Sequence, residues 1–594
     1  MLKGTPQGGV LSPLLWNLVI NSLLVSLNTS LHKPDFTQGF ADDLVTAVTG
    51  ENLHALISQM QLIVNTIKDW CKANDLELSP HKTSLVLFTW KRKFVIDTPI
   101  LIDDHPINYS TDVRYLGLIL DQKLNWKKHV EHVIHKATWT LLATRRTIGK
   151  NWGYSKNTAQ WIYKSVVLPA VTYGCHVWGL NPKSHIIAKL SKVQSLACRT
   201  IVHCPKYTSR RSMEVTTGIL PLHSEINKSA SSTLFRLHGH NRFNLVNNTR
   251  TKFLPHSANY SNCLTPSMEH WDITRPERFK TPMFITNLAN EELMNALISS
   301  HKSVTDQYHF CCFTDGSRLN NKTGSALVVY SMYNNDPLAT FKWRLDDRNT
   351  VYQAEMMAIR EACIFLRSLS CLNASIAIFT DSLSSVHALS AEASSSRLCI
   401  DTRRELDILT AECSSVFLTW IRGHAGIQGN ELADTLAKEW TTCSFLKAVP
   451  LPTTLFKSTL RDNSYTTRAT DWSAVATSNT LHSLLAHYSL PQHVSFFKSL
   501  NRRNSRILTA FLDNRAPLRA FLQKLDNTIN PTCSYCLSGR QDNSHILVYC
   551  PALKFQRLRH LGFSPRLADV NRIPPHALLK FLLSTPLLSL SGPC

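Results

Sequence analysis

Four acidic side chains in the second half of this 594-residue chain either follow strand-like runs or lie on expected helices. Asp315 and Asp381 each come directly after a short run rich in β-forming residues, at positions where a strand is expected to end. Glu355 falls on the apolar face of a helix expected over residues 351–366, where an ionised carboxylate is costly unless a cation or a strong donor satisfies it. Asp434 lies in the next expected helix. These placements predict carboxylates that converge on one point.

Converging carboxylates repel one another, and two divalent cations about 3.5 to 4 Å apart would relieve that repulsion while clamping a scissile phosphate. Mg²⁺ is the expected ion, with Mn²⁺ as a substitute, because a hard cation prefers oxygen ligands. Asn430 is placed to cap the helix that carries Asp434. His424, in a loop flanked by glycines, is placed to move a proton near the leaving group. The pattern predicts a metal-dependent nuclease site.

The elements that must position these side chains alternate along residues 308–442. Strand-like runs cover Phe310 to Thr314, Ala326 to Tyr330, Ile376 to Thr380 and Val416 to Trp420, with helix-like runs between them. This alternation is typical of an α/β layer structure. Singly, each motif has a plain explanation, since a Thr-Asp-Gly-Ser is usually a turn and a lone glutamate on a helix is usually solvated. The order and spacing of the set make it specific.

Together these segments resemble a type-1 ribonuclease H domain over roughly residues 308–442. The resemblance implies a mixed sheet flanked by helices and hydrolysis of the RNA strand of RNA–DNA hybrids, with two Mg²⁺ or Mn²⁺ ions at the site. Residue by residue, it implies Asp315, Glu355, Asp381 and Asp434 as metal ligands and His424 as the loop histidine.

The N-terminal block carries a second set of motifs, the segment Gly4-Thr5-Pro6-Gln7-Gly8 and, between apolar runs, Phe40-Ala41-Asp42-Asp43. These resemble a reverse transcriptase palm, partial here and spanning residues 1–125. The resemblance implies that Asp42 and Asp43 sit at a hairpin-like turn and hold metals, that Gln7 supports the template, and that Lys82 assists pyrophosphate departure. Residues 126–215 resemble the thumb of jockey-like non-LTR retrotransposon polymerases.

The polymerase resemblance has one departure. In that family the first metal-binding aspartate lies upstream of the Pro-Gln-Gly segment, which begins here at the fourth residue. We therefore expect a retrotransposon polyprotein fragment whose polymerase part is incomplete and either inactive or complemented in trans. An active polymerase would require a misassigned start at Met1 and the missing aspartate in upstream sequence.

The final block, residues 443–594, is helical in pattern and contains Cys533-x₂-Cys536-x₈-His545-x₄-Cys550. Three thiolates and one imidazole match a closed tetrahedral structural Zn²⁺ site, and the alternative is a chance grouping among 16 cysteines. Similar Cys-Cys-His-Cys clusters follow ribonuclease H in this retroelement group. Further residues could contact nucleic acid or simply belong to solvated faces and helical cores, namely Arg502, Arg503, Arg506, Arg540, Trp152, Trp161 and Trp178.

Composition sets the remaining limits. The chain is long enough for several domains, so we expect a multidomain α/β and α+β protein, with residues 216–305 as a linker rich in Asn, Ser, Thr, His and Pro. Lys and Arg number 64 against 42 Asp and Glu, and the net charge of +22 favours RNA and DNA as partners. The early apolar run, residues 11–27, is too short and too polar to span a membrane, and no secretory signal precedes it.

These observations favour an intracellular protein, nuclear or cytoplasmic, with reduced cysteines and no membrane partner; they identify no protein partner. The expected activity is ribonuclease H cleavage. The alternative is a non-catalytic nucleic-acid-binding remnant of a retroelement, whose acidic residues are present but misassembled. Metal-dependent turnover would separate the two.

Overall fold

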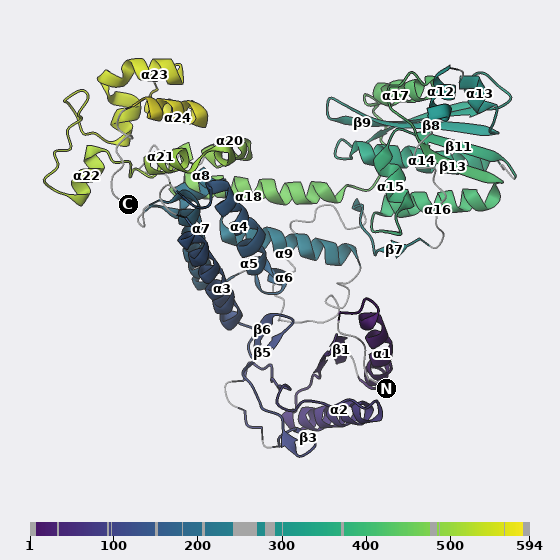
Figure 1. Ribbon diagram of the computed structural model, residues 1–594, viewed down its shortest axis with the longest axis horizontal. Helices are drawn as coiled ribbons and strands as arrows, with labels where there is room; N and C mark the ends of the chain where they lie inside the picture. Colours follow the sequence, from purple (N-terminus) through teal and green to yellow (C-terminus); the bar gives the residue numbers. More distant parts are fainter. Residues whose placement is uncertain are drawn as a thin grey trace. The chain divides into compact units, whose positions relative to one another are not determined.

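The computed structural model describes most of the chain (Figure 1). The described residues are 8–31, 35–91, 94–96, 98–148, 152–180, 182–204, 208–240, 270–279, 291–299, 301–369, 373–475, 484–485, 487–563 and 565–585. They fall into two compact units, one ending at Trp139 and the other beginning at Thr140. Among these residues, no helix combines the length and the apolar character needed to cross a bilayer.

The first unit is built from short strand pairs and long helices. Its elements are α1 (Ser12–Ser30), β1 (Phe36–Phe40), β2 (Asp43–Ala47), α2 (Leu53–Ala73), β3 (Leu101–Ile102), β4 (His105–Pro106), β5 (Asp112–Tyr115), β6 (Leu118–Asp121) and the first part of α3 (Lys127–Arg146). β1 and β2 pair antiparallel with Phe40 opposite Asp43, and only Ala41 and Asp42 form the turn. Leu23 and Leu27 of α1 pack against Ile63 and Ile67 of α2 to form a small core.

A five-stranded mixed sheet dominates the α/β part of the second unit. Its strands are β8 (Phe310–Leu319), β9 (Lys322–Ser331), β10 (Ala339–Leu345), β11 (Ser375–Thr380) and β13 (Ser415–Trp420). The order is β10-β9-β8-β11-β13, antiparallel from β10 to β8 and parallel from β8 to β13. The parallel pairs require crossover helices, and the sequence supplies them.

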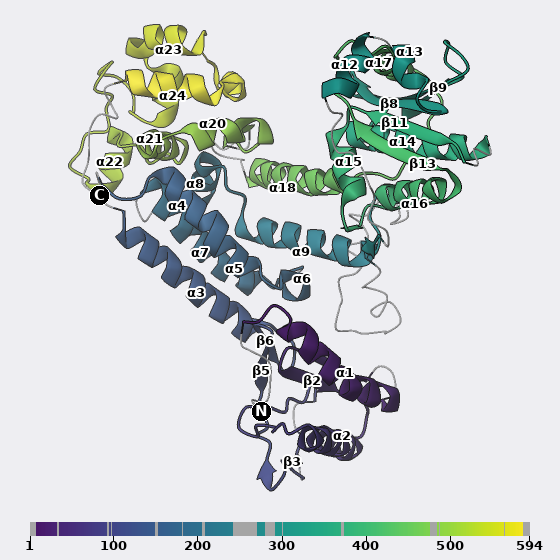
Figure 2. The ribbon, with the colours of Figure 1, turned by 45° about the vertical axis from the view of Figure 1, so that its right-hand side comes forward.

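Both faces of this sheet are covered, as Figures 1 and 2 show. Helices α14 (Val351–Ser368), α15 (Leu383–Ser390) and α16 (Arg397–Glu412) cover one face, and α12 (Glu291–Ser299), α13 (His301–Thr305) and α17 (Gln428–Trp440) cover the other. Along β11, Ile376 and Ile378 join the first core, whereas Ala377 and Phe379 join the second. A strand with apolar side chains on both faces is typical of a doubly covered sheet. The expected fold class, a mixed sheet flanked by helices, is confirmed.

The helix expected over residues 351–366 is α14, and its start is fixed by a capping box. The Thr350 hydroxyl accepts a hydrogen bond from the Gln353 amide at 3.3 Å, and the Gln353 side chain accepts one from the Thr350 amide at 3.3 Å. This reciprocal arrangement satisfies two backbone donors that a helix start otherwise leaves open.

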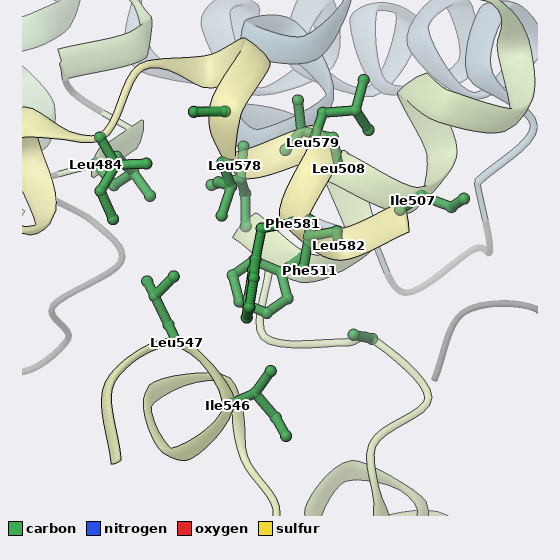
Figure 3. Packing of buried hydrophobic residues seen from close by; sticks show 14 of the residues in the cluster. Leu484, Ile507, Leu508, Phe511, Ile546, Leu547, Leu578, Leu579, Phe581 and Leu582 are labelled. Atoms are coloured by element: carbon green, nitrogen blue, oxygen red, sulfur yellow. The ribbon is translucent and has the colours of Figure 1, made fainter. Parts of the chain in front are cut away.

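The remaining helices lie on both sides of the α/β domain in sequence. Before it come α4 (Lys156–Ile162), the π-helical turn Tyr163–Val167, α5 (Leu168–Thr172), α6 (Cys175–Trp178), α7 (Ser184–Val202), α8 (Arg210–Thr217) and α9 (Leu222–Gly239). After it come α18 (Thr453–Val475), α20 (Val494–Ser499), α21 (Arg502–Leu512), α22 (Arg519–Leu525), α23 (Lys554–Leu561) and α24 (Pro575–Ser584). Figure 3 shows part of their core, with Phe511 of α21 beside Phe581 of α24 and with Ile546 and Leu547 nearby.

The segment expected to be a linker, residues 216–305, differs from that expectation in its described parts, and its last part forms α12 and α13 of the α/β domain. Residues 222–239 form α9, in which Ile226, Ala230 and Leu234 are buried at four-residue intervals. Residues 270–279 lie against the α/β domain, where β7 (Glu277–Arg278) pairs with β12 (Ala393–Ser394). The Asp272 carboxylate accepts hydrogen bonds from the Ser396 hydroxyl at 2.8 Å and the Leu398 amide at 3.0 Å. Residues 241–269 and 280–290 lie outside the described residues.

Candidate active site and metal-capable clusters

Asp315 and Asp381 stand side by side because their strands run parallel. β11 pairs with β8 up to Thr380 opposite Thr314, so both aspartates immediately follow the last paired residues. Asp381 comes directly after its strand, as expected, whereas Asp315 lies within β8, which continues to Leu319 in its pairing with β9.

Glu355 reaches the same point from α14. Oxygen atoms of Asp315, Glu355 and Asp381 all lie within 4.8 Å of one another. The close approach depends on Gly316, because a Cβ atom there would lie 2.8 Å from the Glu355 amide nitrogen and 3.0 Å from the Val351 carbonyl oxygen. Any larger residue at this position would push α14 and its carboxylate away from β8.

Burial makes this cluster electrostatically costly. Burial raises the pKa of Asp315 to about 7, and the charges of Asp381 and Asp434 add to the rise. Burial also raises the pKa of Glu355 well above its usual value, with Asp315 as the next cause. The pKa of Asp381 is raised by burial and held down in part by the Asn430 side chain.

The donor set fits a divalent cation. Asp315 Oδ2 and Glu355 Oε2 are buried, and neither oxygen has a hydrogen-bond partner among the described residues. A carboxylate oxygen buried without a donor is expensive, and a hard cation would satisfy both atoms at once. These two oxygens and the nearby Asp381 therefore form a credible cation site made only of oxygen ligands.

Asp434 and His424 lie at the rim of this cluster. Asp434 Oδ2 accepts a hydrogen bond from Lys438 Nζ at 2.6 Å, and His424 Nδ1 lies 3.9 Å from the same oxygen. The His424 side chain is 78% exposed. Its loop crowds the acidic residues, since a Cβ atom on Gly423 would lie 2.8 Å from Asp381 Oδ2. The structure thus brings all five predicted residues to one site, with Asp434 held by a lysine beside the three-carboxylate cluster.

These residues line an open cavity of about 550 Å³ together with side chains that the sequence analysis missed. Lys438 and Arg318 are the two cations among its lining residues. Lys438 follows Asp434 by four residues on α17, a spacing that places two side chains on one helical face and could have identified it. Asn430 does not cap α17, because the helix already begins at Gln428. Its side chain forms a hydrogen bond with the Asp381 carboxylate instead.

The residues expected for the polymerase lie in the first unit. Asp42 is in the β1–β2 turn and Asp43 is the first residue of β2, both exposed, which is the hairpin-like placement that the sequence indicated. Lys82 lies in a turn, with its amide donating to the Ser79 carbonyl at 3.2 Å. Gln7 lies outside the described residues. Within the described part of the chain, neither aspartate belongs to a cluster of three or more metal-capable groups.

The expected cysteine and histidine cluster is assembled. The ligand atoms of Cys533, Cys536, His545 and Cys550 lie within 4.8 Å of one another, with Cys533 Sγ 3.9 Å from Cys550 Sγ and Cys536 Sγ 3.3 Å from His545 Nε2. Hydrogen bonding from Ser538 lowers the pKa of Cys536 to about 6, which favours the thiolate that a metal requires. Burial and the neighbouring Cys533 raise the pKa of Cys550 to about 11, and a bound cation would reverse that shift.

The other residues that were candidates for contact with nucleic acid differ in their exposure to solvent. Trp178 is 4% exposed and packs in the core, whereas Trp152 and Trp161 are 66% and 65% exposed. Arg502 is engaged within the protein, donating to the carbonyl oxygens of Ile201 at 3.3 Å and Tyr154 at 2.7 Å. Arg503 and Arg540 are exposed and remain available for phosphate contacts.

Two protein families match parts of this chain. Residues 1–120 match the reverse transcriptase (RNA-dependent DNA polymerase) family, and residues 307–441 match the RNase H family.

Relatives by sequence include polymerases and Pol polyproteins of mobile elements. A probable RNA-directed DNA polymerase from transposon X-element of Drosophila melanogaster is 28% identical over 40% of this chain and 26% of its own length. A Pol polyprotein from the type-1 retrotransposable element R1 of Bradysia coprophila is 25% identical over 39% and 23%, and the polymerase from mobile element jockey of Drosophila melanogaster is 24% identical over 40% and 26%. The matched region spans about a quarter of the length of these relatives.

Solved structures of RNase H proteins align with less than a quarter of this chain. The N-terminal RNase H domain of rv2228c from Mycobacterium tuberculosis is 18% identical, covers 23% of this chain and 94% of the solved chain, and gives a TM-score of 0.20. RNase H1 from Halobacterium salinarum is 21% identical over 22% of this chain and 96% of its own, with a TM-score of 0.19. LC11-RNase H1, solved in complex with an RNA/DNA hybrid, is 17% identical, covers 22% of this chain and 94% of its own, and gives 0.19.

Proposed function

Because this chain joins a reverse transcriptase segment to an RNase H domain and has non-LTR retrotransposon polymerases as its homologues, we propose that it hydrolyses the RNA strand of RNA–DNA hybrids. The reaction is metal-dependent and endonucleolytic. The observation that carries this proposal is the cluster of Asp315, Glu355 and Asp381, of which the first two are buried and each have a buried oxygen without a hydrogen-bond partner among the described residues.

The division of roles follows from position. Asp315, Glu355 and Asp381 would hold divalent cations, with Asp434 as the fourth ligand; such ions, when bound, stabilise charge on the scissile phosphate and activate water. His424 is exposed at the rim, where it can move a proton to the leaving group and return it to solvent. Lys438 neutralises Asp434 and presents a positive charge to the cavity, which suits a phosphate backbone.

Hybrid nucleic acid is the proposed substrate. The RNase H family match and the net charge of +22 both point to a polyanion, and the reverse transcriptase match on the same chain points to a setting in which DNA is copied from RNA. The rival function is the non-catalytic nucleic-acid-binding remnant, and the ion pair that holds Asp434 on Lys438 rather than within the three-carboxylate cluster is the feature that favours it.

The test is cleavage of a labelled RNA–DNA hybrid with Mg²⁺, with duplex DNA and duplex RNA of the same sequence as controls. Asp381→Asn should abolish cleavage because it removes a ligand charge while keeping side-chain size. Asp336→Asn, the same substitution at an exposed loop position of the same domain, should leave cleavage unchanged. Tight hybrid binding by the natural chain without metal-dependent cleavage would instead establish the remnant.

We also propose that the Cys533, Cys536, His545 and Cys550 cluster holds Zn²⁺. A set of three thiolates and one imidazole is a common structural zinc site, and these groups are already within reach of one ion. Metal analysis of the purified chain should find zinc in the natural sequence and a loss of that zinc in Cys536→Ser. The inactivity of the polymerase segment stays a prediction.

A further inference from the structure

The helices before and after the RNase H domain share one hydrophobic core. Val215 of α8 is buried in the same cluster as Phe497 of α20, Leu508 and Phe511 of α21 and Leu578 of α24. Several hundred residues separate Val215 from these partners in the sequence. The thumb-like block and the C-terminal tail, which the RNase H domain separates in the sequence, are therefore in direct contact.

Buried polar groups join the same two segments. The Asp513 carboxylate accepts hydrogen bonds from the Ser209 amide and the Ser212 hydroxyl, each at 2.9 Å. Lys156, only 3% exposed, donates from Nζ to the carbonyl oxygens of Phe497 at 2.7 Å and Leu500 at 3.1 Å. A buried charge is tolerated only where such partners are present, so each segment completes the hydrogen bonding of the other.

Opposite charges also meet at this junction. Arg468 of α18 is buried and donates from Nη1 to the Ile219 carbonyl at 3.0 Å. Glu214 of α8 is fully buried, with Arg210 Nε 3.6 Å from its carboxylate. Burial raises the pKa of Glu214 to about 7, and the charges of Arg210 and then Arg468 oppose that rise. Removal of Arg468 would therefore leave the carbonyl groups of Ile219 and Ser489 without this donor and would remove one of the charges that oppose the pKa rise of Glu214.

The chain enters and leaves the RNase H domain at adjacent positions. Trp271, before the domain, forms a parallel bridge with Leu451, after it. The Asp272 amide donates to the Leu451 carbonyl at 2.7 Å, and the Leu451 amide donates to the His270 carbonyl at 2.6 Å. Adjacent ends are the property that lets one domain be inserted into another without distorting it.

The cysteine and histidine cluster lies in the shared core rather than apart from it. Cys533 and Cys550 are fully buried members of the same hydrophobic cluster as Val215, together with Ile546 and Leu547 from the turn that carries His545. Arg557 donates to the Cys550 carbonyl at 2.7 Å. A metal that fixes these two thiolates would therefore also fix side chains that pack against the thumb-like helices.

We propose that residues 156–239 and 453–585 form one discontinuous folding unit, the helical module, which metal binding at the cysteine and histidine cluster stabilises as a whole. The RNase H domain is an insertion in this module and folds independently of it. The metal-dependent half of this inference rests on the zinc site proposed above; the shared core does not.

Hydrogen exchange of the whole 594-residue chain tests both halves of the proposal. Cys536→Ser, or removal of zinc by a chelator, should raise exchange in α7 and α8 by roughly tenfold or more, together with residues 527–563, while β8 and α14 stay unchanged. Cys443→Ser, at a partly buried cysteine outside the cluster, is the matched control and should change none of them. Metal content is measured on the same samples, and a natural chain that carries no zinc would overturn the metal-dependent half.

A second variant pair tests the shared core without touching the cluster. Arg468→Met should loosen α8 and the tail together, whereas Arg461→Met on the exposed side of the same helix should have no effect. Faster exchange confined to the tail, or faster exchange that also includes β8 and α14, would overturn the proposal. Neither result bears on hybrid cleavage, so the proposed ribonuclease activity succeeds or fails separately.

Discussion

Without divalent cations, the RNase H domain should lose stability as the pH rises from about 4 to about 7, because burial and nearby acids raise the pKa of Asp315 from 3.8 to about 7. A carboxyl group with a raised folded-state pKa favours folding fully only below its unfolded pKa. That contribution to stability is lost as the pH rises through the pKa of the folded state. The shift is about three pKa units, and at about 1.36 kcal/mol per unit it corresponds to a loss of about 4 kcal/mol by pH 8.

Asp315→Asn keeps the side-chain size but removes the charge, so the variant without cations should be more stable than the natural chain at pH 8 by up to about 4 kcal/mol. The two proteins should converge near pH 4. Saturating Mg²⁺ should reverse the order at pH 8, because the natural site then gains a ligand that the variant binds poorly.

The assay measures the urea-induced unfolding of the domain by the rate of hydrogen exchange in β8 and α14. The protein is first dialysed against buffer free of magnesium and manganese. Asp336→Asn, at an exposed position of the same domain, is the control and should follow the natural chain at every pH. An equal pH dependence for Asp315→Asn and the natural chain would refute the reasoning, as would a natural chain that is most stable at pH 8 without cations.

Four further substitutions have outcomes set by local geometry. Gly316→Ala should destabilise the RNase H domain by about 1 to 3 kcal/mol, measured by urea unfolding, because its Cβ would lie 2.8 Å from a backbone nitrogen of α14; unchanged stability would mean that α14 can shift freely. Lys438→Gln should lower the Mg²⁺ concentration for half-maximal hybrid cleavage, since it removes the cation that holds Asp434; a higher requirement would contradict this account. Trp178→Ala should lower the free energy of unfolding by about 3 to 5 kcal/mol because Trp178 is buried, whereas Trp161→Ala, at an exposed position, should change it by no more than about 0.5 kcal/mol. Thermal unfolding that shows the larger loss for Trp161→Ala would refute the burial assignment.

The acidic site is predictable because local patterns determine it. Asp381 follows an apolar strand, so the pattern of residues places its carboxylate at the end of that strand. Glu355 lies on the apolar face of a helix, so the pattern implies a buried carboxylate there. The pairing of Asp434 with Lys438 is equally readable from its four-residue spacing. The sequence could not show how far Asp434 stands from the other three acids, because that depends on how α17 packs against the sheet.

The helical module was not predictable in the same way. Val215 and Phe497, which share one buried cluster, lie on opposite sides of a whole domain in the sequence, and such a pairing leaves no periodic signal in the chain. α9 is a different case. Its polar composition suggested a linker, yet the four-residue spacing of Ile226, Ala230 and Leu234 already indicated one buried helical face.

The bridge between Trp271 and Leu451 has a mechanical consequence. A pulling force applied at the two ends of the chain would pass through the helices and across this bridge, and would reach the five-stranded sheet only after the bridge had broken. Because the two connections are adjacent, the inserted domain would carry almost no load until then. In a force-extension experiment the five-stranded sheet should therefore unfold only after this bridge has broken, whatever its own thermodynamic stability.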